Sequence, residues 1–173
     1  MRILALCLLC VLSLQAAPET RLSQWVLDSW NMDSGLPQNT VTSIEQTRDG
    51  YLWLAMRAGV VQFDGVRSTL FDRSRIPGLG TNIITNLRVD GQGQLWAAPL
   101  EPGLLRWDGL KWNRVGTDAG LPQKEIAAMH VGPNGRLWAA PARGGLFEWD
   151  GTKFSAVSTP KPLPPSSILR MLV

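Results

Sequence analysis

The feature that most constrains the fold of this chain is an internal repeat with a period of about 43 residues. Two dipeptides return in one order: Leu52-Trp53, Leu95-Trp96 and Leu137-Trp138, followed by Asp64-Gly65, Asp108-Gly109 and Asp150-Gly151. Self-similarity at such a period indicates one supersecondary unit that is used repeatedly. Elements are therefore assigned unit by unit.

Turn residues divide each unit into four short apolar runs, which in the first unit are 41–46, 52–56, 60–63 and 67–71. Glycines after Asp or Asn supply the positive φ of tight hairpins, so each unit reads as a four-stranded antiparallel meander. The second run is apolar on both sides and needs cover on both faces. We therefore predict an all-β fold, a β-propeller fragment of three full blades and the start of a fourth. A β-sandwich with coincidental Trp spacing is the alternative, and the runs are too short for a helical repeat.

Composition and charge exclude some classes of protein. The chain has 173 residues, of which 45% are hydrophobic and 18% are charged, with 17 Gly and 12 Pro. This is the composition of a turn-rich globular protein. Its formal charge of +3 is small, and no run of Lys and Arg occurs, so we expect no nucleic-acid partner.

Residues 1–17 have the layout of a secretory signal peptide. Arg2 is followed by an apolar stretch of twelve residues, Ile3 to Leu14, and by Ala16-Ala17. An uncleaved anchor or a wrongly placed start are the alternatives. The signal predicts a periplasmic or otherwise extracytoplasmic location. Both cysteines, Cys7 and Cys10, lie in this segment, so the rest of the chain has no thiol and no disulfide.

Residues 22–173 form the predicted partial propeller, with repeats at about 35–77, 78–119, 120–162 and an incomplete 163–173. Trp25 to Leu27 reads as one further strand, which either completes the last sheet of the propeller or covers an edge. The fourth repeat stops within its first strand, which would leave an open strand edge. We therefore expect the chain to be the N-terminal part of a longer protein.

Several motifs together resemble the two-component regulator propeller repeat. They are Gly-Leu-Pro-Gln-Asn at 35–39, Asp-Gly-Tyr-Leu-Trp at 49–53 and the segment 59–65 that ends in Phe-Asp-Gly. The resemblance covers residues from about Trp25 to Val173, and it implies the periplasmic sensor of a bacterial signalling protein. It also implies a membrane-anchored histidine kinase or diguanylate cyclase downstream, which this chain lacks. Where the family usually has Gly-Thr two residues after the Trp, this chain has Ala55-Met56, Ala98-Pro99 and Ala140-Pro141, and we expect Pro99 and Pro141 to end their strands.

The sequence offers no catalytic constellation. His130 is the single histidine and lies in an apolar run, and no metal-binding, phosphate-loop or nucleophile motif occurs. Asp49, Asp64, Asp108 and Asp150 all precede a glycine, so turn chemistry accounts for them. We predict that the chain is not an enzyme and has no cofactor and no metal. The repeated tryptophans are expected to pack between blades rather than bind sugar.

A ligand site is predicted on one rim of the propeller, where the loops between units meet the turns between second and third strands. Amides and charged groups converging there suit hydroxyl-rich or anionic ligands, and a small molecule or oligosaccharide is the expected partner, with dimer formation left open. Solvated loop residues are the alternative reading. The candidates are Gln38, Asn39, Arg57, Thr81, Asn82, Glu101, Gln123, Lys124 and Arg143.

The sequence thus favours an extracytoplasmic ligand-sensing propeller of a signal-transduction protein, of the two-component or diguanylate cyclase type. The alternative is a secreted propeller carbohydrate-active enzyme, such as a lyase or glycosidase, or a lectin fragment. An enzyme of that kind needs paired carboxylates at the channel, and this chain offers only Glu101 on the relevant rim. A truncated product without a function of its own is the third reading.

Overall fold

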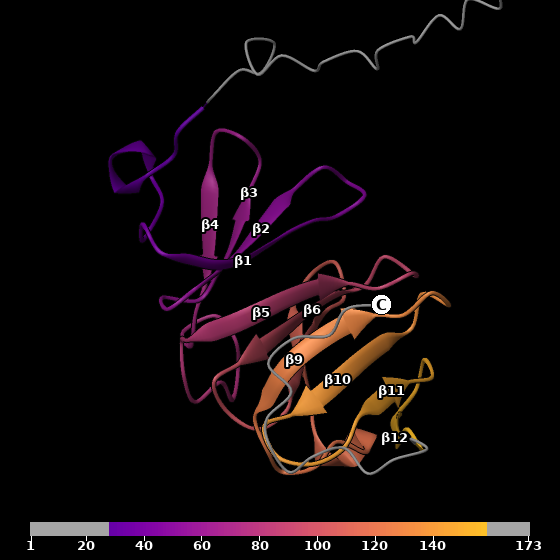
Figure 1. Ribbon diagram of the computed structural model, residues 1–173. Helices are drawn as coiled ribbons and strands as arrows, with labels where there is room; N and C mark the ends of the chain where they lie inside the picture. The colour runs from indigo at the N-terminus through magenta and orange to yellow at the C-terminus, as the bar shows by residue number, and fades with distance from the viewer. Residues whose placement is uncertain (1–27, 159–173) are drawn as a thin grey trace, which may run out of the picture.

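The computed structural model describes residues 28–158, which fold into three four-stranded sheets (Figure 1). Each sheet is an antiparallel meander in which strands that follow one another in sequence are neighbours. The first sheet contains β1 (Val41–Gln46), β2 (Leu52–Met56), β3 (Val60–Phe63) and β4 (Ser68–Phe71). The second contains β5 (Ile84–Val89), β6 (Leu95–Pro99), β7 (Leu104–Trp107) and β8 (Trp112–Val115). The third contains β9 (Ile126–Val131), β10 (Leu137–Pro141), β11 (Phe147–Trp149) and β12 (Phe154–Ala156).

The predicted strands are confirmed for the first repeat, except that the fourth strand begins at Ser68, one residue later than expected. Short 3-10 helices, η2 (Met32–Ser34) and η3 (Thr117–Ala119), precede the first and third sheets. The predicted signal peptide at 1–17, the strand at Trp25 to Leu27 and the incomplete repeat at 163–173 lie outside the described residues.

Proline ends the second strand in two of the sheets, as predicted. Pro99 is the last residue of β6 and Pro141 the last residue of β10. Proline has no backbone N–H to donate, which is consistent with a strand end. The next residue still bonds to the first strand, since the Leu100 N–H donates to the Ile83 carbonyl and the Ala142 N–H to the Glu125 carbonyl, both at 2.8 Å.

The repeated tryptophan occupies the same register position in every sheet. It lies in the second strand, with one partner residue in the first strand and one in the third. The triplets of first-strand partner, tryptophan and third-strand partner are Glu45, Trp53 and Gln62; Arg88, Trp96 and Arg106; and His130, Trp138 and Glu148. The predicted sequence repeat is therefore a structural repeat.

Two of these tryptophans fill the spaces between neighbouring sheets. The Trp53 ring lies 5.2 Å from the Trp107 ring and 5.7 Å from the Trp112 ring, both in the second sheet. The Trp96 ring lies 5.1 Å from the Trp149 ring of the third sheet. Burying about 150–250 Å² of a tryptophan contributes about 4–6 kcal/mol. The predicted packing between units is confirmed for Trp53 and Trp96, which are buried, whereas Trp138 is half-buried.

Polar contacts align the sheets along their first strands, where β1, β5 and β9 lie next to one another (Figure 1). The Thr42 hydroxyl donates to the Ile84 carbonyl at 2.9 Å, and the Leu87 N–H donates to Ser43 Oγ at 3.1 Å. The Gly91 N–H donates to the Gly135 carbonyl at 2.7 Å, which joins the first hairpins of the second and third sheets.

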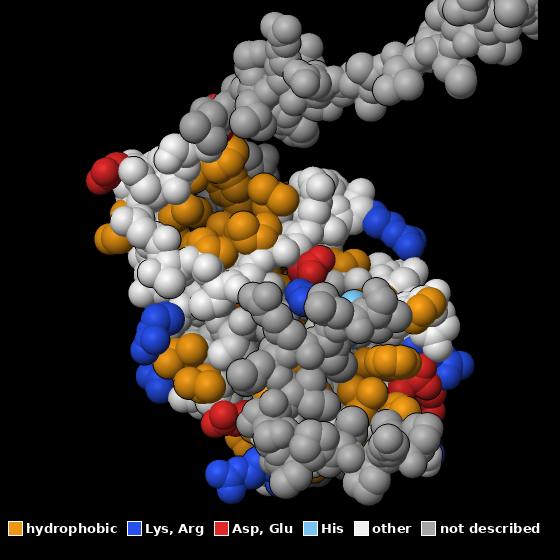
Figure 2. Space-filling view, in the orientation of Figure 1, with side chains coloured by type: hydrophobic (Ala, Val, Ile, Leu, Met, Phe, Trp, Pro, Cys, Tyr) orange, Lys and Arg blue, Asp and Glu red, His pale blue; other side chains and the backbone are white. Residues whose placement is uncertain are grey.

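The first sheet carries a separate apolar cluster on the face that points away from the second sheet. The buried residues of this cluster are Leu36, Leu54, Met56 and Val61. Figure 2 shows hydrophobic side chains gathered over this sheet.

Within residues 28–158 no helix has the length and apolar character needed to cross a membrane.

Candidate functional site

The meander topology gives the molecule two rims. The loop rim carries the loops that connect one sheet to the next and the turns between second and third strands. The hairpin rim carries the other two turns of each sheet. All nine predicted site residues lie in segments of the loop rim, but their side chains have different partners.

In the first sheet, two of the predicted residues hold loops in place. Gln38 Oε1 accepts a hydrogen bond from the Ala58 N–H at 3.0 Å, and Asn39 Oδ1 accepts one from the Met32 N–H at 2.9 Å. Arg57 is exposed. The side-chain amide oxygens of Gln38 and Asn39 are therefore already hydrogen-bonded within the protein, and Arg57 remains open to solvent.

The second sheet uses its predicted residues in the same way. Thr81 Oγ1 accepts from the Ile83 N–H at 3.1 Å, and Asn82 Oδ1 accepts from the Arg73 N–H at 3.0 Å. Glu101 accepts from the Gly80 N–H at 2.9 Å through Oε2 and forms an ion pair with Arg114 through Oε1. Both oxygens of the Glu101 carboxylate thus join protein groups, which gives Glu101 a structural role.

The predicted residues of the third sheet do come together. Gln123, Lys124 and Arg143 line a pocket of about 310 Å³ with Pro102, Glu125 and Ala142. Lys124 Nζ donates to the Arg143 carbonyl at 2.9 Å, while the side chains of Gln123 and Arg143 are exposed. Of the nine candidates, these three line one pocket, and the other six do not contribute to it.

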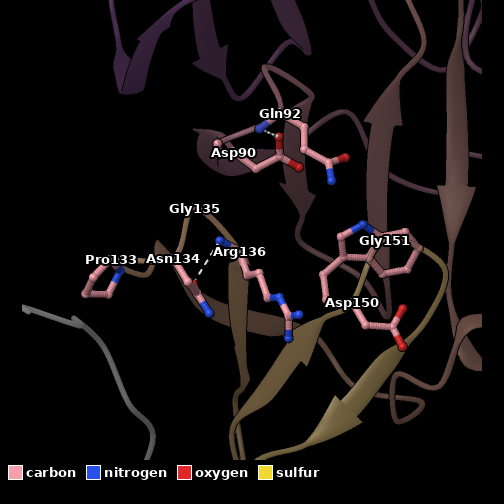
Figure 3. A pocket seen from close by; sticks show the side chains of 10 residues that line it. Asp90, Gln92, Pro133, Asn134, Gly135, Arg136, Asp150 and Gly151 are labelled. Carbon is pink, nitrogen blue, oxygen red and sulfur yellow. Dashed lines mark hydrogen bonds between the residues drawn. The ribbon is translucent and has the colours of Figure 1, made fainter.

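A larger pocket, of about 470 Å³, lies on the hairpin rim between the second and third sheets (Figure 3). Three hairpins contribute polar side chains to it. Gln92 comes from the β5–β6 hairpin, Asn134 and Arg136 come from the β9–β10 hairpin, and Asp150 comes from the β11–β12 hairpin. Figure 3 shows Gln92 on one side of the space and Asn134 with Arg136 on the other. We call this cavity the hairpin pocket.

Asp90 fixes the second-sheet side of the hairpin pocket. It is the only buried charged residue within 28–158, with 6% of its surface exposed. Its Oδ1 accepts from the N–H groups of Gln92 and Gln94 at 3.0 and 2.9 Å, and its Oδ2 accepts from Trp96 Nε1 at 2.9 Å. The Asp90 carboxylate is therefore fully used in shaping the hairpin, and the Gln92 side chain is left to face the pocket.

Glu148 fixes the third-sheet side. It accepts hydrogen bonds from Trp138 Nε1 and Asn134 Nδ2, both at 3.0 Å, and from Arg136 at 3.2 Å. These bonds, that from Trp138 first, lower the pKa of Glu148 below its usual value. Arg136 keeps the rest of its guanidinium for solvent or a ligand, since the side chain is 52% exposed.

The acids that precede glycine act as turn residues, as predicted. Asp150 Oδ1 accepts from the N–H groups of Thr152 and Lys153, and Asp108 Oδ1 accepts from those of Leu110 and Lys111. Backbone N–H donors, those of Lys111 and Lys153 first, lower the pKa of Asp108 and Asp150 from 3.8 to about 2. Asp150 therefore carries a negative charge in the hairpin pocket at neutral pH.

A row of titratable groups follows the first strands, where Glu45, Arg88 and His130 hold matching positions. Arg88 forms an ion pair with Glu45 at 3.2 Å. Burial raises the pKa of Glu45, and Arg88 offsets part of this effect. No group of three or more His, Cys, Asp or Glu residues in the described segment could hold a metal ion.

The fold and one repeat match known proteins. Residues 35–58 match the family described as two component regulator propeller. This segment is a two-component regulator propeller repeat. The predicted resemblance is thereby confirmed on the first repeat. A comparison with curated proteins gives no match.

Solved structures extend the likeness to all three propeller repeats. The extracellular domain of the hybrid two-component system BT3049 from B. thetaiotaomicron has a TM-score of 0.68 at 23% identity, over 82% of this chain and 20% of that one. The extracellular domain of BT4673 from the same organism gives 0.61 at 19% identity, over 81% and 20%. Virginiamycin B lyase from Staphylococcus aureus, with quinupristin, gives 0.55 at 15% identity, over 70% and 42%.

These likenesses confirm the predicted fold class, in which each sheet is one propeller blade. The chain spans about a fifth of the length of the two-component system structures. At these identities the comparison concerns the fold.

Sequence reasoning placed the candidate site on the loop rim and did not single out the hairpin pocket on the other rim. The residues that form it stand in or beside glycine turns, which are fully explained by hairpin formation. Asp90 could have been noticed, because it directly follows the first strand of its repeat and precedes Gly91. At the position of Asp90 the other two repeats have Thr47 and Gly132. An acid that replaces a hydroxyl and a glycine at one repeat position is the available signal.

Proposed function

We propose that this chain is the ligand-sensing propeller of an extracytoplasmic sensor in a bacterial signal-transduction protein. The observation that carries the proposal is the two-component regulator propeller repeat at residues 35–58, within blades that resemble the extracellular domains of two hybrid two-component systems. The layout of residues 1–17 as a secretory signal supports the location. In this proposal a membrane-coupled output domain belongs to the full-length protein.

The hairpin pocket is the ligand site that the geometry supports best. Its groups that remain free to bind are the Gln92 amide, part of the Arg136 guanidinium and Asp150 Oδ2. Together they donate to and accept from hydroxyl groups, which is the chemistry of a neutral saccharide. Because Gln92 belongs to the second blade and Arg136 and Asp150 to the third, a bound ligand would link two blades.

Such a link gives a simple mechanism for sensing. A ligand that contacts two blades stabilises the arrangement in which their hairpins are close. A free ligand concentration of 100 times Kd stabilises the folded state by about 2.7 kcal/mol. A membrane-coupled output would then respond to the population of that arrangement.

The test is binding of three neutral disaccharides, cellobiose, maltose and lactose, to the full 173-residue chain by calorimetry and thermal shift. We expect Gln92→Ala to weaken binding about tenfold, since it removes hydrogen bonds without disturbing the hairpin. Arg143→Ala, on the opposite rim, is the matched control. Loss of binding with Arg143→Ala alone would instead place the ligand in the pocket lined by Gln123, Lys124 and Arg143. Absence of binding to all three sugars would contradict a neutral saccharide ligand.

A further inference from the structure

A second groove between the same two blades contains an arginine without a counter-ion among residues 28–158. It lies next to the β11–β12 hairpin, has a volume of about 300 Å³, and is lined by Arg106, Arg114, Val115, Asp118, Ala119, Trp149, Gly151 and Thr152. Trp149 and Gly151 separate it from the hairpin pocket, since they line both. We call it the Arg106 groove.

Arg106 is held in a fixed position by two aromatic rings. Its guanidinium carbon lies 5.8 Å from the centre of the Trp96 ring and 5.8 Å from that of Trp149, within the range of cation–π attraction. The two indoles themselves meet edge to face at 5.1 Å. The side chain is therefore pre-organised, so little conformational entropy is lost when a ligand binds to it.

The hydrogen-bonding capacity of Arg106 is unused by the described residues. Its Nε is buried and has no hydrogen-bond partner, and Arg106 makes no ion pair in this part of the chain. The neighbouring Arg114 is different, because it pairs with Glu101 and donates to the carbonyls of Gly78 and Pro102. Buried donors normally find partners, and an arginine fork is shaped for a planar anion.

We propose that the Arg106 groove binds a carboxylate carried on a small hydroxylated molecule. The guanidinium of Arg106 takes the carboxylate, and the free oxygen of Asp118 accepts from a hydroxyl group. Thr152 Oγ1 donates its own hydrogen to Asp150 Oδ1 at 2.8 Å, so it offers the ligand an acceptor only. Asp118 has one oxygen occupied, since its Oδ1 accepts from the Gly116 N–H at 3.1 Å. Its negative charge favours a singly charged carboxylate over a doubly charged phosphate.

This site goes beyond the proposed function and does not depend on it. The hairpin pocket is proposed for neutral sugars and relies on Gln92, whereas the Arg106 groove requires a negative charge on the ligand. The two binding events can therefore be measured separately.

The probe is glucuronate, compared with glucose, which has hydroxyls without a carboxylate, and acetate, which has a carboxylate without hydroxyls. Binding to the full chain is followed by calorimetry and by the NMR signal of the Arg106 Nε–H, assigned by its loss in Arg106→Lys. We expect saturable binding of glucuronate that shifts this signal, and binding of glucose and acetate that is weaker by about tenfold or more. Equal binding of glucose and glucuronate would overturn the proposal.

Three variants of the groove and one control outside it make the test independent of folding defects. Arg106→Gln is expected to weaken glucuronate binding about tenfold or more, and Arg106→Lys, which keeps the charge and loses the fork, by a smaller factor. Asp118→Asn keeps the bond to Gly116 and removes a repelling charge, so it should strengthen binding about twofold to fivefold. Arg75→Gln, at an exposed arginine outside the groove, should bind like the unchanged chain. Weaker binding by Asp118→Asn, or unchanged binding by Arg106→Gln, would refute the site.

Discussion

Replacing Gly91 by alanine tests whether the second and third blades pack hairpin against hairpin. A Cβ atom on Gly91 would lie 2.6 Å from the Cα atom and 2.9 Å from the carbonyl oxygen of Gly135, where ordinary contact begins at 3.4 Å. Both obstructing atoms belong to the backbone, so no side chain can turn aside. The hairpins would have to separate by roughly 1 Å, which also stretches the 2.7 Å hydrogen bond from the Gly91 N–H to the Gly135 carbonyl.

The cost follows from these two effects. Overpacking of a close contact costs about 1–3 kcal/mol, and weakening one backbone hydrogen bond adds about 0.5–1.5 kcal/mol. We therefore expect Gly91→Ala to destabilise the chain by about 2–4 kcal/mol. For a protein of this size that lowers Tm by about 5–15 °C.

The assay is thermal unfolding followed by tryptophan fluorescence and circular dichroism, with Gln92→Ala as the control. Gln92 is the next residue of the same hairpin, and its side chain is exposed, so its replacement should change stability by less than about 0.5 kcal/mol. If the two variants melted at the same temperature, the close packing of the two hairpins would be refuted.

Three further predictions concern the carboxylates. Asp90→Ala should cost about 2–4 kcal/mol in urea unfolding, because three donors lose a buried acceptor. The low folded-state pKa of Asp108 and Asp150 means that each stabilises the fold above pH 4, and that this contribution is lost as pH falls through about 2. A double Asp108→Asn, Asp150→Asn variant should therefore show a smaller decrease of Tm between pH 4 and pH 2 than the unchanged chain. Glu101→Ala should destabilise the chain by about 1–2 kcal/mol without altering ligand affinity, since Glu101 holds Arg114 and a loop N–H.

The fold was predictable because each strand is bounded by residues with one clear conformational role. Gly50, with φ of 90°, adopts a backbone that other residues avoid, and so its place in a hairpin can be read directly from the sequence. Pro99 and Pro141 are the last residues of their strands, as expected, although β2 ends at the matching Met56 without a proline. Trp53 and Trp96 were predictable as packing residues because three copies of one motif need one common explanation.

The site was harder to predict because the use of a polar group depends on its partners. Asn39 and Asn82 look like ligand-binding amides in sequence, yet each accepts a backbone N–H from a residue seven or nine positions earlier. Gln92 stands between two glycines and looks like a turn residue, yet its side chain faces the hairpin pocket. The roles of Asn39 and Asn82 depend on hydrogen bonds to residues outside their own motif, and the role of Gln92 depends on the packing of two blades. A local sequence pattern contains neither kind of information.

The repeated tryptophan keeps the same register position in every blade, but its indole N–H has a different acceptor in each. Trp53 Nε1 donates to Thr47 Oγ1, and Trp96 Nε1 donates to Asp90, which stands at the matching position of the second blade. In the third blade that position is a glycine, so Trp138 Nε1 donates across the sheet to Glu148.

The charge of the third-strand residue that pairs with this tryptophan also differs from blade to blade. Glu148 occupies the register position that Arg106 holds in the second blade and Gln62 in the first, each opposite the repeated tryptophan. Arg106 has no acceptor for an indole N–H, so the Trp96 indole donates to Asp90, outside this position, and the Arg106 guanidinium lies over the ring instead. The residues that repeat build identical blades, so a ligand can distinguish one gap between blades from the next only through positions such as these, where the copies differ.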